Sequence, residues 1–172
     1  MEGVKLVTRK AWGARRPTRT VALPLDQARG VAVHYSGMNA DEQATHRNCA
    51  ARVRAIQRFH IETRGWFDIA YSWVVCKHGY VFRGRGIGKR TAANGTAAAN
   101  NRYYAVCFLG DDTKGRDDVS EAGRQALVGV LRFVDRQIPA RMRVRPHSDF
   151  VATGCPGNEL RAFIARRPWA RH

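Results

Sequence analysis

The chain has 172 residues, 44% of them hydrophobic, which suits one globular domain with a substantial core. Its 30 Lys and Arg residues outnumber the 14 Asp and Glu residues and give a formal net charge of +16, while no apolar run approaches the roughly 20 residues of a membrane span. The charge indicates an anionic partner, which would be nucleic acid, an anionic membrane surface or an acidic cell-wall polymer.

The N-terminus and the cysteines indicate where the chain is made. The opening stretch MEGVKLVTRKAWG lacks the apolar segment of a classical signal peptide. The four cysteines do not have the spacing of a disulfide framework, and Cys76 and Cys107 lie within apolar runs. We therefore expect synthesis in a reducing compartment.

The first half of the chain predicts one strand, one long helix and a hairpin. Residues 1–30 contain several Gly and Pro residues and are expected to be mostly irregular. GVAVHY, at 30–35, has the continuous apolar character of a short buried strand. Residues 41–64 carry apolar side chains at helical spacing and predict a long helix that ends at Gly65. Alternation within 68–86, interrupted by a Lys-His-Gly turn, predicts a β-hairpin.

A loop, another strand and a second helix are predicted next. Residues 84–101 are rich in Gly, Ala and Asn and predict a long loop. YYAVCFLG, at 103–110, predicts a strand, and the polar residues 111–118 predict a turn. The following helix has an apolar face that ends at Ile138, immediately before Pro139.

The C-terminal part is expected to contain a functional loop and a short helix. A basic segment around Val144 leads into the loop HSDFVATGCPG at 147–157, and a helix with an apolar face follows before Pro168. No repeat, linker or low-complexity tract divides the chain. The sequence therefore predicts a single α/β domain over residues 1–172, with its core at about 7–167.

The loop at 147–157 contains two side chains that zinc prefers, the imidazole of His147 and the thiolate of Cys155. A third ligand is needed, and His34 is the best placed because it lies near the end of a strongly apolar strand. Two histidines and one thiolate leave a fourth tetrahedral position for water, as in catalytic zinc sites. The alternative is that Cys155 is a buried packing residue without a metal.

His46 and Cys49 form a rival metal pair, because they are spaced i, i+3 on the predicted first helix. However, Cys49 falls on the apolar face of that helix, and no second pair with conventional zinc-site spacing accompanies them. Tyr71 is a candidate electrophile, since a phenol on a central strand can donate a hydrogen bond to a developing oxyanion. Its alternative role is an aromatic ring packed on the sheet.

Taken together, these segments resemble the type 2 N-acetylmuramoyl-L-alanine amidases, a family that includes peptidoglycan recognition proteins and short phage endolysins. Five segments match in order over roughly residues 7–165: TRKAWGAR at 8–15, VAVHYSG at 31–37, GWFDIAYSWVV at 65–75, GYVFRGRG at 79–86, and HSDFVATGCPG. The resemblance implies a central mixed β-sheet flanked by helices.

The resemblance also implies roles for particular residues. The family's zinc ligands fall on His34, His147 and Cys155, its catalytic positions on Tyr71 and Thr153, and its cleft-lining positions on Trp66 and Arg85. Two departures stand out. Ser148 replaces the usual arginine, which we expect to affect loop packing more than chemistry, and residues 88–101 lack a histidine often found there.

The implied activity is zinc-assisted hydrolysis of the amide between N-acetylmuramic acid and L-alanine in bacterial peptidoglycan. We expect a monomeric phage endolysin, made in the host cytoplasm without a signal peptide and attracted to anionic wall polymers by its charge. One alternative is a non-catalytic peptidoglycan-binding protein, although retention of Cys155 favours an enzyme. The other is a nucleic-acid-binding protein, disfavoured because the basic residues are dispersed and no binding motif is present.

Overall fold

The computed structural model describes residues 1, 3–37, 45–111 and 119–170. Its centre is a six-stranded sheet with the strand order β1-β4-β3-β5-β2-β6. The β3–β4 pair is antiparallel and the other neighbours are parallel. The strands are β1 (Lys5–Val7), β2 (Gly30–Tyr35), β3 (Trp73–Cys76), β4 (Tyr80–Arg83), β5 (Tyr103–Leu109) and β6 (Arg143–Pro146).

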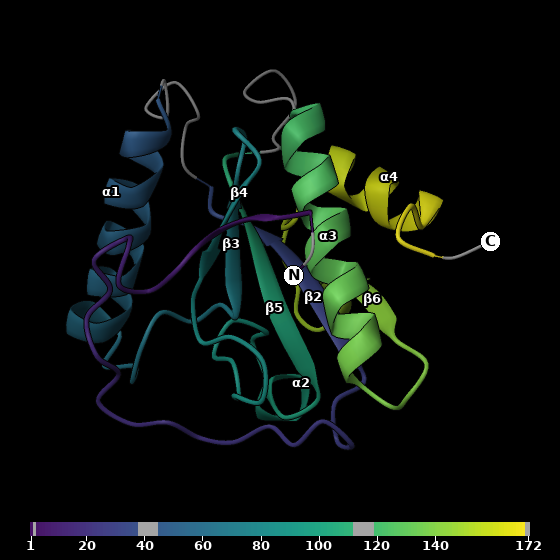
Figure 1. Ribbon diagram of the computed structural model, residues 1–172. Helices are drawn as coiled ribbons and strands as arrows, with labels where there is room; N and C mark the ends of the chain where they lie inside the picture. Colours follow the sequence, from purple (N-terminus) through teal and green to yellow (C-terminus); the bar gives the residue numbers. More distant parts are fainter. Residues whose placement is uncertain (2, 38–44, 112–118, 171–172) are drawn as a thin grey trace.

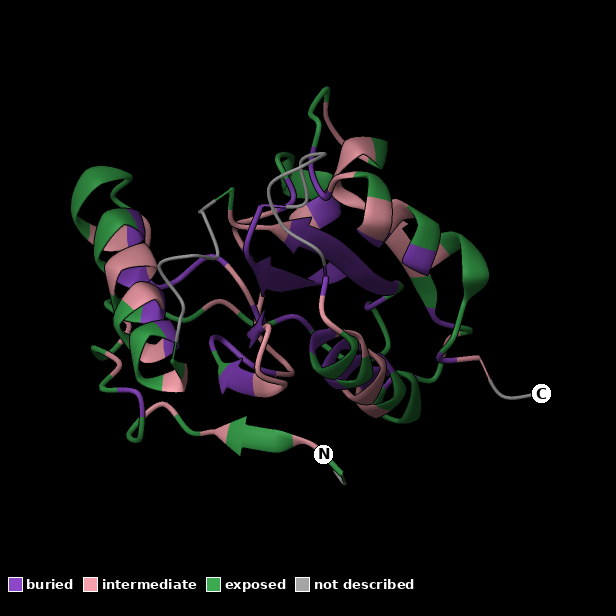
Figure 2. Ribbon diagram, turned by 90° about the horizontal axis from the view of Figure 1, so that it is seen from above, coloured by how far each residue is buried: buried purple, intermediate pink, exposed green. Residues whose placement is uncertain are grey.

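Helices cover both faces of the sheet, with α1 on one side and α3 and α4 on the other (Figures 1 and 2). The helical segments are α1 (His46–Arg58), the π-helix η2 (Phe59–Thr63), α2 (Ala97–Asn100), α3 (Glu121–Gln137), the 3-10 turn η3 (His147–Asp149) and α4 (Asn158–Arg166). The hydroxyl of Ser120 caps α3 by accepting a hydrogen bond from Gly123 N at 3.0 Å. Among the described residues, none of the helices combines the length and the apolar character that crossing a bilayer requires.

The predicted α/β architecture and most of its elements are confirmed. Strands β2 and β5, the β3–β4 hairpin and helices α3 and α4 lie where the sequence predicts them. Of the predicted helix 41–64, α1 and η2 cover 46–63, while residues 41–44 lie outside the described part of the chain, as do 112–118 of the predicted turn.

Three short elements were not predicted from the sequence. The region expected to be irregular contains the edge strand β1, and the basic segment around Val144 forms β6, the other edge strand. The loop at 84–101 contains the single-turn helix α2. Each of these elements is only three or four residues long, so its formation depends on pairing or packing with neighbours rather than on a periodic sequence pattern.

Alternation along the strands assigns the functional side chains to one face. Val31 and Val33 of β2 belong to the apolar cluster under α3 and α4. Because successive side chains in a strand point to opposite faces, His34 points to the α1 side. Its partner in the sheet register, Cys107 of β5, belongs to the second apolar cluster, which lies under α1. The sheet thus presents His34 at the carboxyl end of β2, on the face covered by α1.

The segment before β3 is held against the chain that follows β4. Gly84 N donates a hydrogen bond to Ser72 O at 3.0 Å, and Arg85 N donates one to Tyr71 O at 3.0 Å. A Cβ atom at Gly84 would lie 2.3 Å from Tyr71 O, so only glycine permits this approach. This close contact fixes the backbone of Tyr71.

Candidate functional site

The structure brings His34, His147 and Cys155 together, and a potential ligand atom from each lies within 4.8 Å of the others. His34 lies at the carboxyl end of β2, and His147 begins η3, directly after β6. β2 and β6 are parallel, and Val33 and Pro146 are their last paired residues. The residue that follows each of them in the chain is a histidine, His34 or His147. Their ring centroids are 4.3 Å apart. Sheet register therefore explains how two histidines distant in sequence become neighbours.

One hydrogen bond determines which nitrogen of His34 can bind a metal. His34 is 2% exposed, and its Nε2 lies 3.0 Å from the side-chain oxygen of Asn94. The Asn94 amide nitrogen lies near three oxygen acceptors, on Thr91, Ala99 and Tyr103. That arrangement fixes Asn94 Oδ1 toward His34, so Nε2 must carry the proton and donate it. His34 Nδ1 is then unprotonated and faces Cys155 Sγ at 3.9 Å.

Cys155 is positioned by contacts from both ends of its loop. Tyr35 N donates a hydrogen bond to Cys155 Sγ at 3.3 Å, and Ser148 N donates one to Cys155 O at 3.1 Å. Arg161 of α4 donates to Gly154 O at 3.0 Å and to Ser148 Oγ at 2.7 Å. Ser148, where the family usually has an arginine, therefore takes part in a hydrogen bond that packs this loop against α4.

Burial keeps the three candidate ligands uncharged when no metal is bound. Burial, followed by the charge of His147, lowers the pKa of His34 to about 3, although the Asn94 bond opposes this shift. Burial also lowers the pKa of His147 and raises that of Cys155 to about 11. Both imidazoles are therefore neutral at neutral pH, as metal binding requires, and a metal ion would displace one proton from the thiol.

The residues fit a zinc ion. An imidazole nitrogen and a thiolate sulfur on one tetrahedral zinc are about 3.5 Å apart, close to the His34–Cys155 separation. His147 Nε2 is buried and has no hydrogen-bond partner in the described part of the chain, so a metal ion would satisfy this polar atom. Two nitrogens and one sulfur form a ligand set typical of zinc.

Tyr71 lies beside this group but not on a strand, which corrects the sequence prediction, because β3 begins two residues later. The ring centroids of Tyr71 and His34 are 5.5 Å apart. Burial, then the nearby thiols Cys107 and Cys155, raise the pKa of the phenol well above 10, and its hydroxyl hydrogen bonds with Cys107. The phenol is therefore a neutral hydrogen-bond donor across the physiological pH range.

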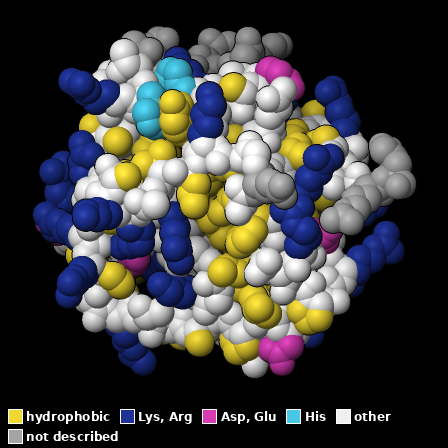
Figure 3. Space-filling view, in the orientation of Figure 1, with side chains coloured by type: hydrophobic (Ala, Val, Ile, Leu, Met, Phe, Trp, Pro, Cys, Tyr) yellow, Lys and Arg dark blue, Asp and Glu magenta, His cyan; other side chains and the backbone are white. Residues whose placement is uncertain are grey.

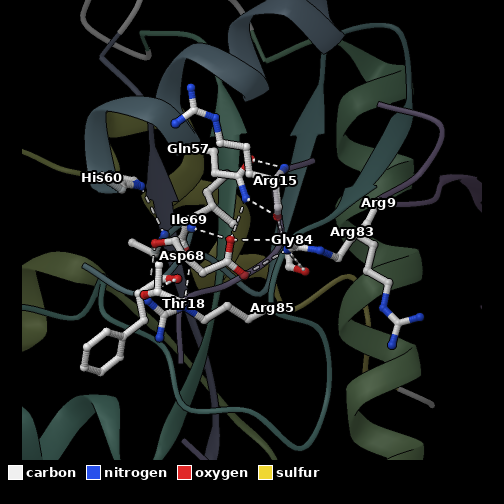
Figure 4. Close-up of polar contacts among 12 residues, drawn as sticks. Arg9, Arg15, Thr18, Gln57, His60, Asp68, Ile69, Arg83, Gly84 and Arg85 are labelled. Carbon is white, nitrogen blue, oxygen red and sulfur yellow. Dashed lines mark hydrogen bonds and ion pairs between the residues drawn. The ribbon is translucent and has the colours of Figure 1, made fainter. Parts of the chain in front are cut away.

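A buried carboxylate organises the segment that leads to Tyr71 (Figure 4). Asp68 accepts hydrogen bonds from Arg9 at 2.9 and 3.1 Å, from Gln57 at 2.7 Å and from the backbone of Ile69 at 2.8 Å. One residue further on, Ala70 N donates to His60 Nδ1 at 3.1 Å. These bonds connect the N-terminal segment and the end of α1 to the residues immediately before Tyr71.

The remaining predicted site residues differ in their surroundings. Thr153 is exposed, and its hydroxyl accepts a hydrogen bond from Cys155 N at 3.2 Å. Trp66 is half-buried and contacts the His60 ring at 4.9 Å, which in turn contacts Tyr71. The catalytic role of Thr153 and the substrate contact of Trp66 stay predictions.

Arg85 is buried, with 8% of its surface exposed. Its guanidinium donates to Ile69 O at 2.7 Å and to Arg90 O at 2.8 Å. Both bonds stabilise the fold around Asp68, and a substrate contact at Arg85 stays a prediction.

Comparison with known proteins identifies the family of the chain. The sequence matches, over residues 24–158, a family model described as N-acetylmuramoyl-L-alanine amidase. The chain belongs to this amidase family. The N-acetylmuramoyl-L-alanine amidase of Sus scrofa is 34% identical over 167 residues, which is 93% of this chain and 26% of that protein. The chain thus spans under a third of the length of the first mammalian amidases it matches.

Several peptidoglycan recognition proteins match this chain over most of their own length. Peptidoglycan-recognition protein SC1a/b of Drosophila simulans is 30% identical over 170 residues, covering 94% of this chain and 87% of that protein. The structure of Drosophila PGRP-LB superposes with a TM-score of 0.87 at 27% identity, covering 98% of this chain and 97% of that one. Peptidoglycan recognition protein-LE, solved in complex with tracheal cytotoxin, gives 0.85 at 26% identity, covering 97% and 96%. The predicted family and fold are confirmed.

Asn94 is the main residue of the candidate site that sequence reasoning missed. It lies in the Gly-, Ala- and Asn-rich loop that lacks the family's usual histidine, and it is fully buried. Its only sequence signal is an amide among small residues, which predicts a turn as readily as a buried contact. Cys107 was likewise interpreted only as a core residue, although it bonds to the Tyr71 hydroxyl.

Replacing Asn94 by Ala should weaken zinc binding roughly 10- to 100-fold, because the variant removes the acceptor that fixes the His34 tautomer. Competition against a chromophoric chelator measures the affinity. Asn101→Ala, at an exposed position after α2, is the matched control and should bind zinc as the wild type does. Equal affinities in the two variants would show that Asn94 does not orient His34.

Acid should destabilise the metal-free protein, because folding holds buried histidines neutral. In the folded chain burial lowers the pKa of His34 to about 3 and that of His60 to about 4, from 6.5. The unfolded chain binds more protons, so this stabilisation is complete above pH 6.5 and is lost as the pH falls through 6.5 toward 4. The free energy of unfolding should fall by about 1.4 kcal/mol per histidine per pH unit.

Urea unfolding of chelator-treated protein between about pH 6.5 and 5 measures this slope. His60→Gln keeps an acceptor for Ala70 N but does not titrate, so its slope should be smaller than that of the wild type. A pH-independent stability over this range would contradict the assignment of neutral, buried histidines.

Proposed function

We propose that the protein is a zinc-dependent amidase that hydrolyses the bond between N-acetylmuramic acid and L-alanine in peptidoglycan. The observation that carries the proposal is the cluster of His34, His147 and Cys155 with Tyr71 beside it. Three ligands leave the fourth position of a tetrahedral zinc site for water or substrate, whereas structural sites are usually closed by four. Membership in the amidase family supports the same activity.

The residues of the chain have separate tasks in this reaction. When bound, zinc supplies Lewis-acid activation of water and of the amide carbonyl. His34, with its tautomer fixed by Asn94, would hold the ion together with His147 and Cys155. The Tyr71 phenol, which stays protonated, donates a hydrogen bond to the developing oxyanion of the amide carbonyl after exchanging its bond with Cys107. Thr153 is the second candidate donor to that oxyanion.

Charge supports attraction to the bacterial wall. Lys and Arg side chains are spread over the face shown in Figure 3, with few acidic side chains among them. A net charge of +16 favours adsorption to a wall that carries anionic polymers. The dispersal of the basic residues supports a general electrostatic attraction rather than recognition of one groove or strand of nucleic acid. We further propose that the protein is a monomeric phage lysin and that it is made in the cytoplasm of the bacterial host.

Hydrolysis of purified peptidoglycan, followed by labelling of new L-alanine amino groups, tests the proposed function. Wild-type protein should release them and lose this activity after chelation, and zinc should restore it. Cys155→Ser should lose most of its activity, because an alcohol is a far poorer zinc ligand than a thiolate. Peptidoglycan binding with no release by metal-loaded wild-type protein would identify a non-catalytic binding protein instead.

Tyr71→Phe should reduce turnover by about 100- to 1,000-fold, because it keeps the ring but removes one oxyanion donor. Zinc content should stay near that of the wild type, since Tyr71 is not a ligand, and KM should change little. Activity, zinc content and thermal stability are measured on one preparation. Wild-type turnover would assign Tyr71 a packing role, and loss of zinc would make it a support for the metal site.

A further inference from the structure

A second group of metal-ligating side chains lies on the same face of the sheet as the first. His46 and Cys49 come from the first turn of α1, and Cys76 ends β3. A potential ligand atom from each of the three lies within 4.8 Å of the others. This group is separate from the amidase site, because β5 lies between β3 and the β2 strand that carries His34.

A fourth donor comes from the β3–β4 turn. His78 lies two residues after Cys76, and its Nδ1 is 3.4 Å from Cys49 Sγ. This separation matches the distance of about 3.5 Å between a nitrogen and a sulfur ligand on one tetrahedral zinc. The sequence predicts only the first pair, His46 and Cys49. By packing the hairpin against α1, the fold adds Cys76 to the first pair and places His78 beside Cys49.

The group is prearranged within the fold. Cys49 and Cys76 are fully buried, and a hydrogen bond joins their side chains. The His46 ring stacks on Tyr80, with ring centroids 3.5 Å apart and an angle of 20° between the planes. His46 hydrogen bonds with Cys76, but among the described residues its buried Nδ1 has no partner at good hydrogen-bond geometry. Such an atom is costly to bury unless something else satisfies it.

We propose that His46, Cys49, Cys76 and His78 form a second, structural zinc site that fastens the beginning of α1 to the β3–β4 hairpin. Two thiolates neutralise the charge of the ion, and four protein ligands leave no position for substrate, as in structural zinc sites. Among the described residues, no side chain caps the N-terminus of α1, and its first turn contains no acidic residue. A bound metal ion would stabilise the first turn of α1, which lacks the contribution of a capping side chain.

Two neighbouring cysteines could instead form a disulfide, but the surrounding groups favour a metal. A disulfide between Cys49 and Cys76 would remove the thiols that now contact the imidazoles of His46 and His78. Zinc uses all four side chains at once. The choice is testable, because a disulfide and a metal site give opposite results for thiol content and metal content.

The first experiment counts zinc per chain in the purified full-length protein by elemental analysis. His46→Phe preserves ring stacking on Tyr80 but removes a ligand, so it should contain one zinc fewer than the wild type. Cys107→Ala is the matched control, because Cys107 is a buried cysteine on a neighbouring strand outside this group, and it should keep the second ion. Equal zinc content in His46→Phe and the wild type would overturn the proposal.

The second experiment keeps the group intact and separates it from the amidase site. Cys155→Ser protein, stripped and reloaded with cobalt, should show thiolate-to-cobalt charge transfer from Cys49 and Cys76, whatever the outcome for the proposed amidase activity. Adding Cys76→Ser should reduce this absorption, and His78→Ala should weaken cobalt binding. Absence of the absorption, unchanged affinity in His78→Ala, or a Cys49–Cys76 disulfide found by mass spectrometry of the native protein would contradict the four-ligand site.

Removal of this metal should also lower thermal stability without abolishing wall hydrolysis. Loss of a tightly bound ion from the folded state should lower the melting temperature by roughly 5–15 °C. Because none of the four residues belongs to the proposed catalytic group, His46→Phe should still hydrolyse peptidoglycan at a temperature where it is folded. An unchanged melting temperature would count against a structural role for the ion.

Discussion

The hydrogen bond between His34 and Asn94 is the interaction on which the proposed zinc chemistry of this protein depends. A buried imidazole has two nitrogens, and only one of them can face a metal. Asn94 decides which one, because its own amide is fixed by three acceptors in the chain that precedes and begins β5. The conformation of this loop of small residues therefore points the side-chain oxygen of Asn94 at His34 Nε2. The fold itself therefore supplies the contact that orients a candidate metal ligand.

Sequence reasoning found the candidate metal ligands from local patterns, such as the apolar strand that carries His34 near its end, whereas Thr153, Trp66 and Arg85 came from the family resemblance. It could not identify Asn94, which lies in a loop without periodicity and contacts residues of β2 and β5. Edge strands β1 and β6 were missed for a related reason, since three or four residues acquire strand structure only from the neighbour they pair with. Tyr71 was placed on a strand because its alternation continues that of β3, although the ladder begins later.

The group around His46 shows a different limit of sequence analysis. The pair on α1 was recognised but set aside, because its apolar neighbours indicated packing and no partner pair was visible. Cys76 and His78 are spaced too closely for a familiar zinc motif, and only docking of the hairpin turn on α1 brings them to the first pair. Burial in an apolar cluster and a role as a ligand are compatible, since structural sites are shielded from water.

The two edges of the sheet add a consequence of the basic composition. Edge strands expose unpaired backbone groups to which a strand from another molecule can add, which promotes aggregation. Here β1 carries Lys5, and β6 carries Arg143, Arg145 and Pro146. Positive side chains repel an identical edge, and proline offers no N–H to a new ladder. The arginines that enrich the surface in charge therefore also keep the sheet from extending into a second copy, which favours solubility at high protein concentration.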